Sequence, residues 1–266
     1  MCDDARRRTQ RGFIPNEIKL YVLTIVFLSF LGCSLMYPTK KPIDTIHYMT
    51  GKERAENLIV MLPGRMDDSA DYMKHGFITA LQNCGIHIDA IAVDAHYGYY
   101  NERNLLPRLY EDVILPARQK GYKNVWLLGI SMGGLGALLY AQQYAHTVNG
   151  LVVLAPFLGD REVCDEISGA GGLAQWSPQE PINDEDYQQA LWKWLKNYIY
   201  SQERLPVLVI GYGKDDRFAD ANRLLAEILP KDQVYVVPGG HEWDSWGKIY
   251  TLFLQSGAIT RSINNR

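Results

Sequence analysis

A serine in a glycine-rich turn is the first residue of this chain that could do chemistry. Ser131 lies in the run GISMGG at 129–134, between the apolar run 124–129 and a helical pattern over 133–145. A serine on so tight a strand-to-helix turn adopts a strained backbone conformation, and residues two positions either side must be small. The turn projects Oγ into open space, and the start of the helix favours developing negative charge. The pattern predicts a nucleophile.

Two later segments hold partners for this serine, which is a weak nucleophile without an adjacent base. The apolar run 205–211 leads into GKDDRF, which places Asp215 and Asp216 just beyond a predicted strand. The run 233–237 is followed by PGGHEW, in which His241 opens the last helical pattern. A histidine that takes the serine proton, oriented by a carboxylate, would complete the nucleophile. Position alone leaves both aspartates open.

These three motifs, in this order and each at a strand end, resemble the α/β-hydrolase superfamily and, more loosely, its small bacterial serine esterases. The resemblance covers about residues 55–257. It implies hydrolysis of an ester, thioester or amide through an acyl-enzyme, with Ser131 as nucleophile and His241 as base. A family turn of the form G-x-x-D, read here from Gly213, selects Asp216 as the orienting acid and leaves Asp215 as the alternative.

The same resemblance implies two backbone N–H groups that bind the oxyanion of the reaction. Met132, directly after the nucleophile, would supply one of them. The other would come from the loop after the run 57–63, where this chain reads PGRM and many relatives have His-Gly. We expect Arg65 rather than Met66 as the second donor. No metal and no cofactor are expected, because the sequence shows no His/Cys cluster with zinc-ligand spacing.

Short apolar runs that alternate with helical patterns predict the elements that position these motifs. The runs span 57–63, 86–93, 124–129, 151–155, 205–211 and 233–237, and the helical patterns about 69–83, 104–120, 133–145, 219–229 and 241–256. Unbroken apolar strands between helices indicate a mostly parallel sheet covered on both faces, so the expected fold class is α/β, of the α/β-hydrolase type. Residues 157–204 do not follow this alternation of strands and helices, and they are predicted to be a small cap inserted between two strands. Residues 34–54 are expected to be a linker and leading segment, and 258–266 a C-terminal tail.

Two aromatic segments are predicted to shape the substrate pocket. The loop 94–100 supplies Tyr97 and Tyr99, and the cap supplies Trp176. Aromatic rings suit an apolar acyl chain, an aromatic acid or a sugar face. The aromatic spacing within 184–200 is equally that of a helix packed on the core. Without a long apolar lid, a small soluble ester is the favoured substrate.

Composition excludes some classes of protein. The chain has 266 residues, a net charge of -3, 47% hydrophobic and 21% charged residues, which is ordinary globular usage. No basic excess exists to bind nucleic acid through its phosphates. Four cysteines are too few for a disulfide scaffold in a chain of this length. Cys84 and Cys164 could pair in an oxidising compartment or remain free thiols.

The first 33 residues differ from the rest of the chain. A basic stretch over 1–19 precedes the uncharged run LYVLTIVFLSFL at 20–31. This run is shorter than the roughly 20 apolar residues of a membrane-spanning helix, and the pattern is typical of a secretory signal. The following FLGCS partly resembles a bacterial lipobox, which implies lipidation of Cys33. We therefore expect a body tethered to the bacterial cell envelope through its N-terminus. An uncleaved anchor, a secreted or periplasmic protein, and a cytosolic protein are the alternatives.

Other functions of the same fold stay open at this point. A thioesterase, a peptidase or a haloperoxidase-like enzyme would keep the same serine turn. A scaffold that binds a ligand or a protein without catalysis, or a lipid-anchored structural protein, is disfavoured because all three triad positions are occupied. Covalent labelling by a fluorophosphonate separates the enzymes from the binding proteins.

Overall fold

The computed structural model describes residues 38–178, 180–183, 186–201 and 205–264. The chain divides into two units, Met1–Pro38 and Thr39–Arg266, and the second is described below. The predicted signal and Cys33 lie outside the described residues. Among the described helices, none has the length and apolar character needed to cross a membrane.

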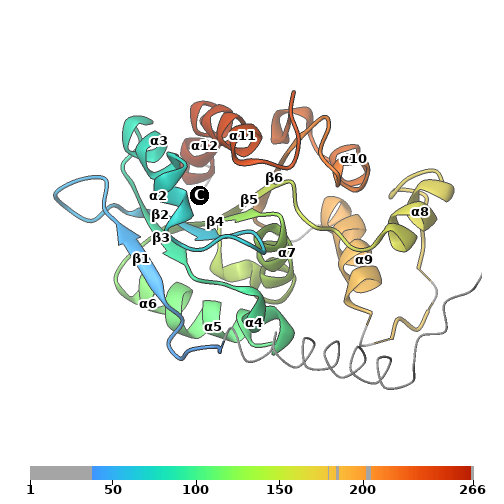
Figure 1. Ribbon diagram of the computed structural model, residues 1–266, viewed down its shortest axis with the longest axis horizontal. Coiled ribbons are helices and arrows are strands. Elements are labelled where there is room, and N and C mark those ends of the chain that lie inside the picture. Colours follow the sequence, from blue (N-terminus) through green and yellow to red (C-terminus); the bar gives the residue numbers. More distant parts are fainter. Residues whose placement is uncertain (1–37, 179, 184–185, 202–204, 265–266) are drawn as a thin grey trace, which may run out of the picture. The chain divides into compact units, whose positions relative to one another are not determined.

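The core of this unit is a seven-stranded sheet in the order β1-β3-β2-β4-β5-β6-β7 (Figure 1). β1 pairs antiparallel with β3, and every other pair in the sheet is parallel. The strands are β1 Thr45–Tyr48, β2 Asn57–Leu62, β3 Ile88–Val93, β4 Asn124–Ile130, β5 Gly150–Leu154, β6 Val207–Gly213 and β7 Val234–Val237. A mostly parallel sheet confirms the expected α/β class.

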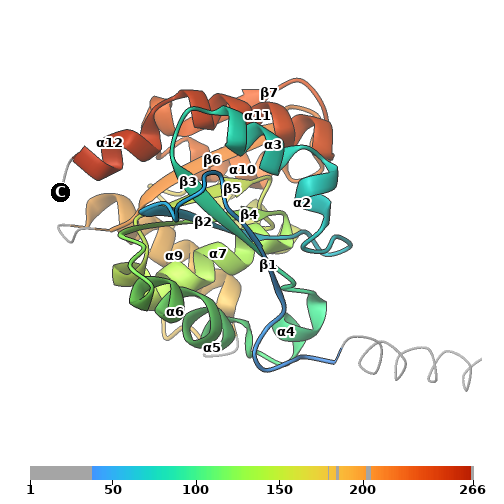
Figure 2. The same cartoon turned by 90° about the vertical axis from the view of Figure 1, so that its left-hand side faces the viewer.

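Helices cover both faces of this sheet. Figures 1 and 2 show α3 and α11 on one face and α5, α6 and α7 on the other. The α-helices are α2 Asp71–Lys74, α3 Phe77–Asn83, α4 Tyr97–Asn101, α5 Leu105–Arg108, α6 Leu115–Gln119, α7 Met132–Tyr144, α8 Arg161–Gly169, α9 Tyr187–Tyr200, α10 Ala219–Ala226, α11 Trp243–Gln255 and α12 Ala258–Asn264. A π-helical turn, Leu109–Ile114, joins α5 to α6.

The central strands are apolar because both of their faces are covered. β3, β4 and β5 are buried along their whole length, as parallel strands between two helical layers must be. Trp126 on β4 is fully buried, and its ring lies where a side chain at Gly150 of β5 would be. Such packing of a large ring over a glycine sets the register of the two neighbouring strands.

The structure forms regular elements in segments that the sequence predicted as irregular, α4 in the loop 94–100 among them. β1 lies within the expected leading segment 34–54, and α12 lies within the expected tail 258–266. β1 is a four-residue edge strand whose residues are all exposed or half-buried, so it carries no apolar run. The sheet therefore begins ten residues before the boundary expected at residue 55.

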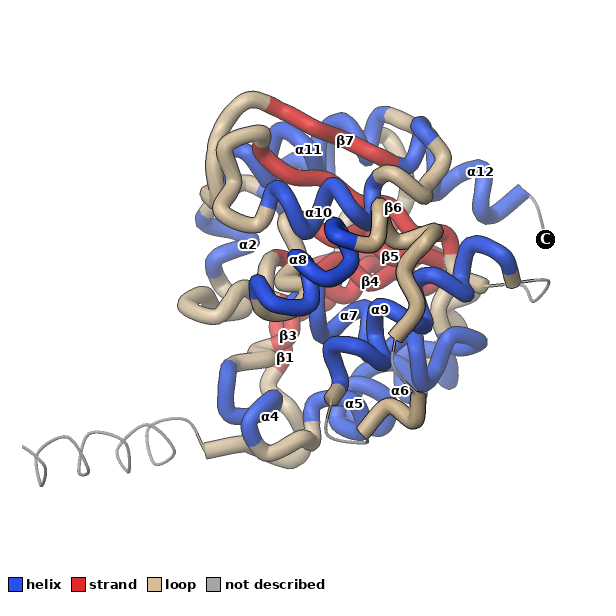
Figure 3. The backbone as a smooth tube through the Cα atoms, turned by 90° about the vertical axis from the view of Figure 1, so that its right-hand side faces the viewer, coloured by secondary structure: helices blue, strands red, loops and turns tan. Residues whose placement is uncertain are grey.

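The inserted segment between β5 and β6 contributes two helices, α8 and α9 (Figure 3). α9 begins where Asp186 caps it by accepting a hydrogen bond from the backbone N–H of Gln189. α8 packs against α10, and α9 packs against α7. Cys164 on α8 and Cys84 after α3 are free thiols, and burial raises the pKa of Cys164 to about 11.

Candidate active site

Ser131 occupies the turn between β4 and α7 with φ 52° and ψ −112°. A positive φ is unfavourable for a residue with a side chain, so the surrounding packing must hold it. The backbone N–H of Ser131 donates to the carbonyl of Leu154 on the neighbouring strand, 2.9 Å away. A methyl group on Gly133 would overlap the carbonyl of Leu62, and one on Gly129 would overlap the backbone of Gly133. The small residues of the motif are thus required by the turn itself.

A chain of two hydrogen bonds connects the serine to a buried carboxylate. His241 Nε2 lies 3.0 Å from Ser131 Oγ, and His241 Nδ1 lies 2.8 Å from Asp216 Oδ2. The side chain of Asp216 is fully buried, and its other oxygen accepts the backbone N–H of Phe218 at 2.8 Å. Asp215 is exposed. Of the two aspartates that the sequence left open, Asp216 is the one that contacts His241.

The loops after β6 and β7 approach each other closely enough to make this contact. A methyl group on Gly213, the last residue of β6, would overlap the carbonyl of Gly239. Gly239 has a φ of 119°, which residues with side chains rarely adopt. The His241 ring then packs edge-to-face on Phe218 and on Trp246, with centroid distances of 5.1 and 5.0 Å. These rings restrict the orientation of the imidazole.

The two predicted oxyanion donors lie on elements that flank Ser131. Met132 is the first residue of α7, where a backbone N–H has no partner within the helix. Arg65 is the second residue of a turn closed by a hydrogen bond from Asp67 N–H to the Gly64 carbonyl, at 3.3 Å. A Cβ at Gly64 would lie 3.8 Å from the Cβ of Ser131, which places this turn beside the serine.

Of the three predicted pocket residues, only Tyr97 reaches the surface. It is 40% exposed, and the Arg65 guanidinium lies over its ring at 4.8 Å. Tyr99 is 1% exposed, and its hydroxyl contacts the backbone N–H and carbonyl of Lys40. The prediction that Tyr99 lines a substrate pocket is wrong, because residues two apart on α4 point to nearly opposite sides of the helix.

Trp176 also has a packing role in place of the predicted pocket role. It is 1% exposed, and its indole N–H donates to Glu166 of α8 at 2.9 Å. Trp192 of α9 is fully buried as well. The aromatic side chains at these positions therefore pack inside the cap. This is the packing role that the helical spacing of aromatic residues within 184–200 also allowed. His96 caps α4, accepting the Gly98 N–H at its Nδ1.

Sequence reasoning missed Asp67 and Phe218. Asp67 Oδ1 accepts the indole N–H of Trp243 at 3.3 Å, and burial raises the pKa of Asp67. Phe218 packs edge-to-face on both His241 and Phe157, which forms an aromatic wall beside the imidazole. No local pattern in the sequence predicts these contacts, because Asp67 and Trp243, and likewise Phe218 and its partners Phe157 and His241, lie far apart along the chain.

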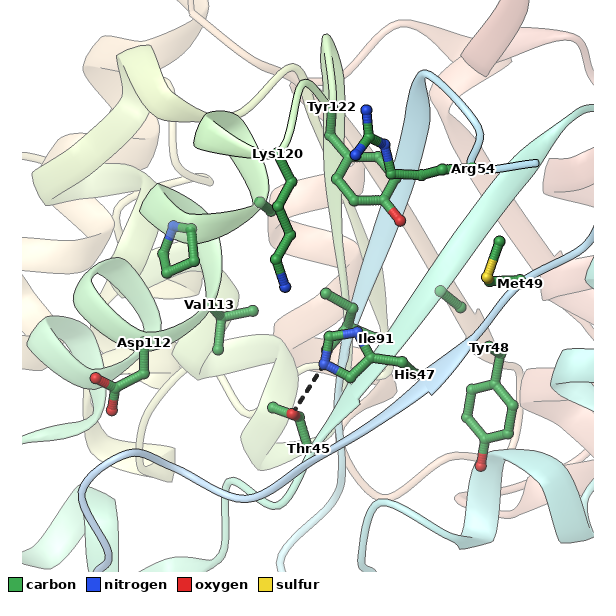
Figure 4. A pocket seen from close by; sticks show the side chains of 13 residues that line it. Thr45, His47, Tyr48, Met49, Arg54, Ile91, Asp112, Val113, Lys120 and Tyr122 are labelled. Carbon is green, nitrogen blue, oxygen red and sulfur yellow. Dashed lines mark hydrogen bonds between the residues drawn. The ribbon is translucent and has the colours of Figure 1, made fainter.

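A separate hollow of about 230 Å³ lies along β1, against α6 and the π-helical turn (Figure 4). We call it the β1 hollow. Its lining includes the basic side chains of His47, Lys120 and Arg54, apolar side chains such as Ile91 and Val113, and the carboxylate of Asp112, which Arg108 holds by two hydrogen bonds. It contains none of the motifs that carry Ser131, Asp216 or His241.

The sheet order, the strained serine turn and the hydrogen-bonded histidine define an α/β hydrolase. Residues 53–204, more than half of the chain, match the family described as serine aminopeptidase, S33, and the chain belongs to that family. An acetyl esterase of Caldicellulosiruptor saccharolyticus is 26% identical over 155 residues, which cover 51% of this chain and 54% of the esterase. The chain thus spans about half the length of the curated relative that it matches.

Solved structures share the fold at low sequence identity. Est1E from Butyrivibrio proteoclasticus aligns with a TM-score of 0.57 and 17% identity, over 84% of this chain and 98% of that one. The S-formylglutathione hydrolase FrmB of Staphylococcus aureus aligns with a TM-score of 0.54 and 18% identity, over 80% and 83%. These likenesses show that the architecture is that of the α/β hydrolases.

Proposed function

We propose that this protein cleaves a carboxylic ester through a triad of Ser131, His241 and Asp216. The observation that carries the proposal is the continuous hydrogen-bond chain, with 3.0 Å between Oγ and Nε2 and 2.8 Å between Nδ1 and Oδ2. A nucleophile bonded to a base that a third group orients is the arrangement that serine hydrolysis needs. Membership in a hydrolase family and likeness to an acetyl esterase support the ester as substrate.

The reaction follows from these contacts. His241 takes the Ser131 hydroxyl proton at Nε2 as Oγ attacks the ester carbonyl, whose π electrons move onto its oxygen. The backbone N–H groups of Met132 and Arg65 are the proposed donors to that oxyanion. Collapse of the tetrahedral intermediate expels the alkoxide, which receives the proton from His241, and leaves an acyl-enzyme. Water then repeats the two steps and releases the carboxylic acid.

Asp216 has an orienting role in this scheme. Its buried carboxylate accepts hydrogen bonds from the Phe218 amide and from His241 Nδ1, so the imidazole is held with Nε2 facing the serine. The carboxylate also stabilises the imidazolium that forms as the serine attacks. Burial strengthens this interaction because little water screens it.

We propose a small ester with a short acyl group as the substrate class. The acetyl esterase relative supports a short acyl chain. Phe157 and Phe218 form the aromatic wall beside His241, and Tyr97 lies with Arg65 at the proposed oxyanion turn. Thioesters and amides react by the same steps, so p-nitrophenyl esters of increasing chain length, compared with matched thioesters and anilides, would define the preference.

Covalent labelling tests the proposed function. We expect the wild-type protein to react with a fluorophosphonate probe and to hydrolyse p-nitrophenyl acetate, and Ser131→Ala to abolish labelling and reduce turnover by about 10⁶-fold. Ser168→Ala is a matched control, because Ser168 is an exposed residue of α8. A wild-type protein that neither labels nor hydrolyses the ester would contradict the proposal.

For the N-terminus we propose secretion and lipidation, on the basis of the sequence pattern alone. A basic stretch, an apolar core and FLGCS support a signal with Cys33 as the modified residue. The protein would then lie in the bacterial cell envelope, tethered by its N-terminus. Mass spectrometry of membrane-extracted protein should find a diacylated Cys33, and Cys33→Ser should prevent the modification. An intact, unmodified Met1 would refute lipidation.

A further inference from the structure

The turn that carries Arg65 is tied to the helix that follows the catalytic histidine. Asp67 closes the turn through its backbone N–H, which donates to the Gly64 carbonyl at 3.3 Å. Its side chain accepts the indole N–H of Trp243, the first residue of α11, also at 3.3 Å. One residue therefore joins the proposed oxyanion turn to the segment that begins two residues after His241.

The Asp67 carboxylate lies directly against the backbone of this turn. Its Oδ2 lies 2.5 Å from the position where a Cβ at Gly64 would be, and the Cβ of Ser131 lies 3.8 Å from the same position. A side chain at residue 64 would displace the carboxylate. Glycine at this position thus lets the carboxylate and the nucleophile approach the turn together.

Trp243 is a firm anchor because aromatic rings surround it. It stacks on His75 at 4.3 Å and makes edge-to-face contacts with Tyr72, Phe77 and Trp246. Trp246 in turn contacts the His241 ring at 5.0 Å. The Tyr72 hydroxyl donates to the Leu62 carbonyl at 2.6 Å, at the end of β2 just before the turn. The cluster thereby fixes the indole N–H relative to the histidine.

We propose that Asp67 is a positioning residue, which holds the Gly64–Asp67 turn so that the Arg65 N–H faces the oxyanion. The inference rests on the proposed ester hydrolysis. An oxyanion donor stabilises the transition state only where its N–H lies about 2.7–3.1 Å from the developing charge. Without the tie to Trp243, the exposed turn samples other conformations, and this precision is lost.

Kinetics of three variants test the role. Asp67→Ala removes the acceptor, and we expect kcat for p-nitrophenyl acetate to fall roughly tenfold while KM stays within about twofold, since the lost interaction acts in the transition state. Asp67→Asn keeps an oxygen that accepts the indole N–H and should restore kcat to within about threefold. Trp243→Phe removes the donor but keeps a ring, and should resemble Asp67→Ala.

The double variant separates positioning from independent structural effects. If Asp67 acts through Trp243, Asp67→Ala combined with Trp243→Phe lowers kcat no further than either change alone. Asp68→Ala is the matched control, because Asp68 is the exposed neighbouring acid and its side chain, in the contacts described, accepts a single local hydrogen bond, from the Ala70 N–H at 2.7 Å. It should leave kcat unchanged.

Several results would overturn the inference: an unchanged kcat in Asp67→Ala, an equal loss in Asp67→Asn, or additive losses in the double variant. If Asp67→Ala does not fold, as judged by circular dichroism, the pair Asp67→Asn and Trp243→Phe decides, since only the second should lower kcat. Failure of the proposed function is distinct, because the wild-type protein itself would then show no labelling and no ester hydrolysis.

Discussion

The carboxyl edge of the sheet and the β1 hollow both gather polar and charged side chains, but the side chains are connected differently in the two regions. At the edge, Ser131, His241 and Asp216 form one hydrogen-bond chain across 110 residues of sequence. In the hollow, His47 bonds only its near neighbour Thr45 among the contacts described, and Arg54 lies over the Tyr122 ring (Figure 4). Within the described part of the chain, no carboxylate forms an ion pair with Lys120 or Arg54.

The difference shows what distinguishes the proposed active site from a solvated hollow. Asp216 is fully buried, and its oxygens are bonded to Phe218 and His241, so its orientation is set before a substrate binds. The basic residues of the hollow are exposed, so their side chains change conformation at little cost in free energy; they are Lys120, Arg54 and His47. Preorganised groups in a site that excludes water act more strongly on a transition state than mobile, solvated ones. The effects of mutations on ester hydrolysis should therefore differ by orders of magnitude between the two regions.

The largest effect is expected at the buried acid. In Asp216→Asn the single amide oxygen accepts the Phe218 N–H and the amide NH2 faces His241 Nδ1, so the imidazole loses the tautomer that can take the serine proton. We expect kcat/KM for p-nitrophenyl acetate to fall by about 10⁴-fold. Asp215→Asn, at the exposed neighbour, should change it by less than about twofold. An equal loss in both variants would mean that burial and the hydrogen bond do not select Asp216.

A smaller loss is expected when the serine turn is forced apart. Gly133→Ala places a methyl group on the Leu62 carbonyl, so α7 must shift together with Ser131. We expect a destabilisation of about 3 kcal/mol from overpacking and a fall in kcat/KM of about a hundredfold from misplacement of the nucleophile. These are measured by thermal unfolding and by ester hydrolysis.

Gly247→Ala is the control for that change. Gly247 lies in α11, and an added Cβ there has open space around it. Alanine is the better helix former by about 1 kcal/mol, so this variant should be at least as stable as the wild type and equally active. If both alanine variants behaved alike, contact with Leu62 would not explain the requirement for glycine in the turn.

The smallest effects are expected in the β1 hollow. Although His47 is exposed overall, partial removal of its ring from water and, secondarily, the charge of Lys120 lower the pKa of His47 below 6.5. Lys120→Gln should therefore raise this pKa, as followed by NMR titration of the His47 ring, and should change ester hydrolysis by less than about twofold. Loss of activity in this variant would show that the hollow is coupled to the triad.

His47 also predicts the sign of a pH effect on stability. Because its folded-state pKa is lowered, protonation favours the unfolded chain, and the stability penalty appears as pH falls below the ordinary value of 6.5. His47→Gln removes this penalty, so the variant should lose less stability than the wild type between pH 7.5 and pH 5. Urea unfolding at both pH values measures the difference. A larger loss in the variant would reverse the assigned direction.

Much of the fold and of the site could be predicted from the sequence because the signals are local. Continuous apolar runs marked six strands, and GISMGG marked the turn at Ser131, since steric limits on a tight turn restrict its residue types. β1 was not predicted, because a short edge strand is half-exposed and carries no apolar run. Tyr99 and Trp176 were misplaced because an aromatic residue fits a pocket wall and a packed core equally well until its neighbours are known.

The α/β architecture, the order of the three motifs and the strained turn at Ser131 could be predicted from local patterns in the chain, because periodicity and turn sterics act over a few residues. The family turn favoured Asp216 over Asp215, but the contact of Asp216 with His241 and the reach of Asp67 to Trp243 are seen only in the folded chain. Those contacts depend on how the loops after separate strands approach one another across the sheet. That approach is set by side-chain packing such as Gly213 against Gly239, which no local pattern in the chain records.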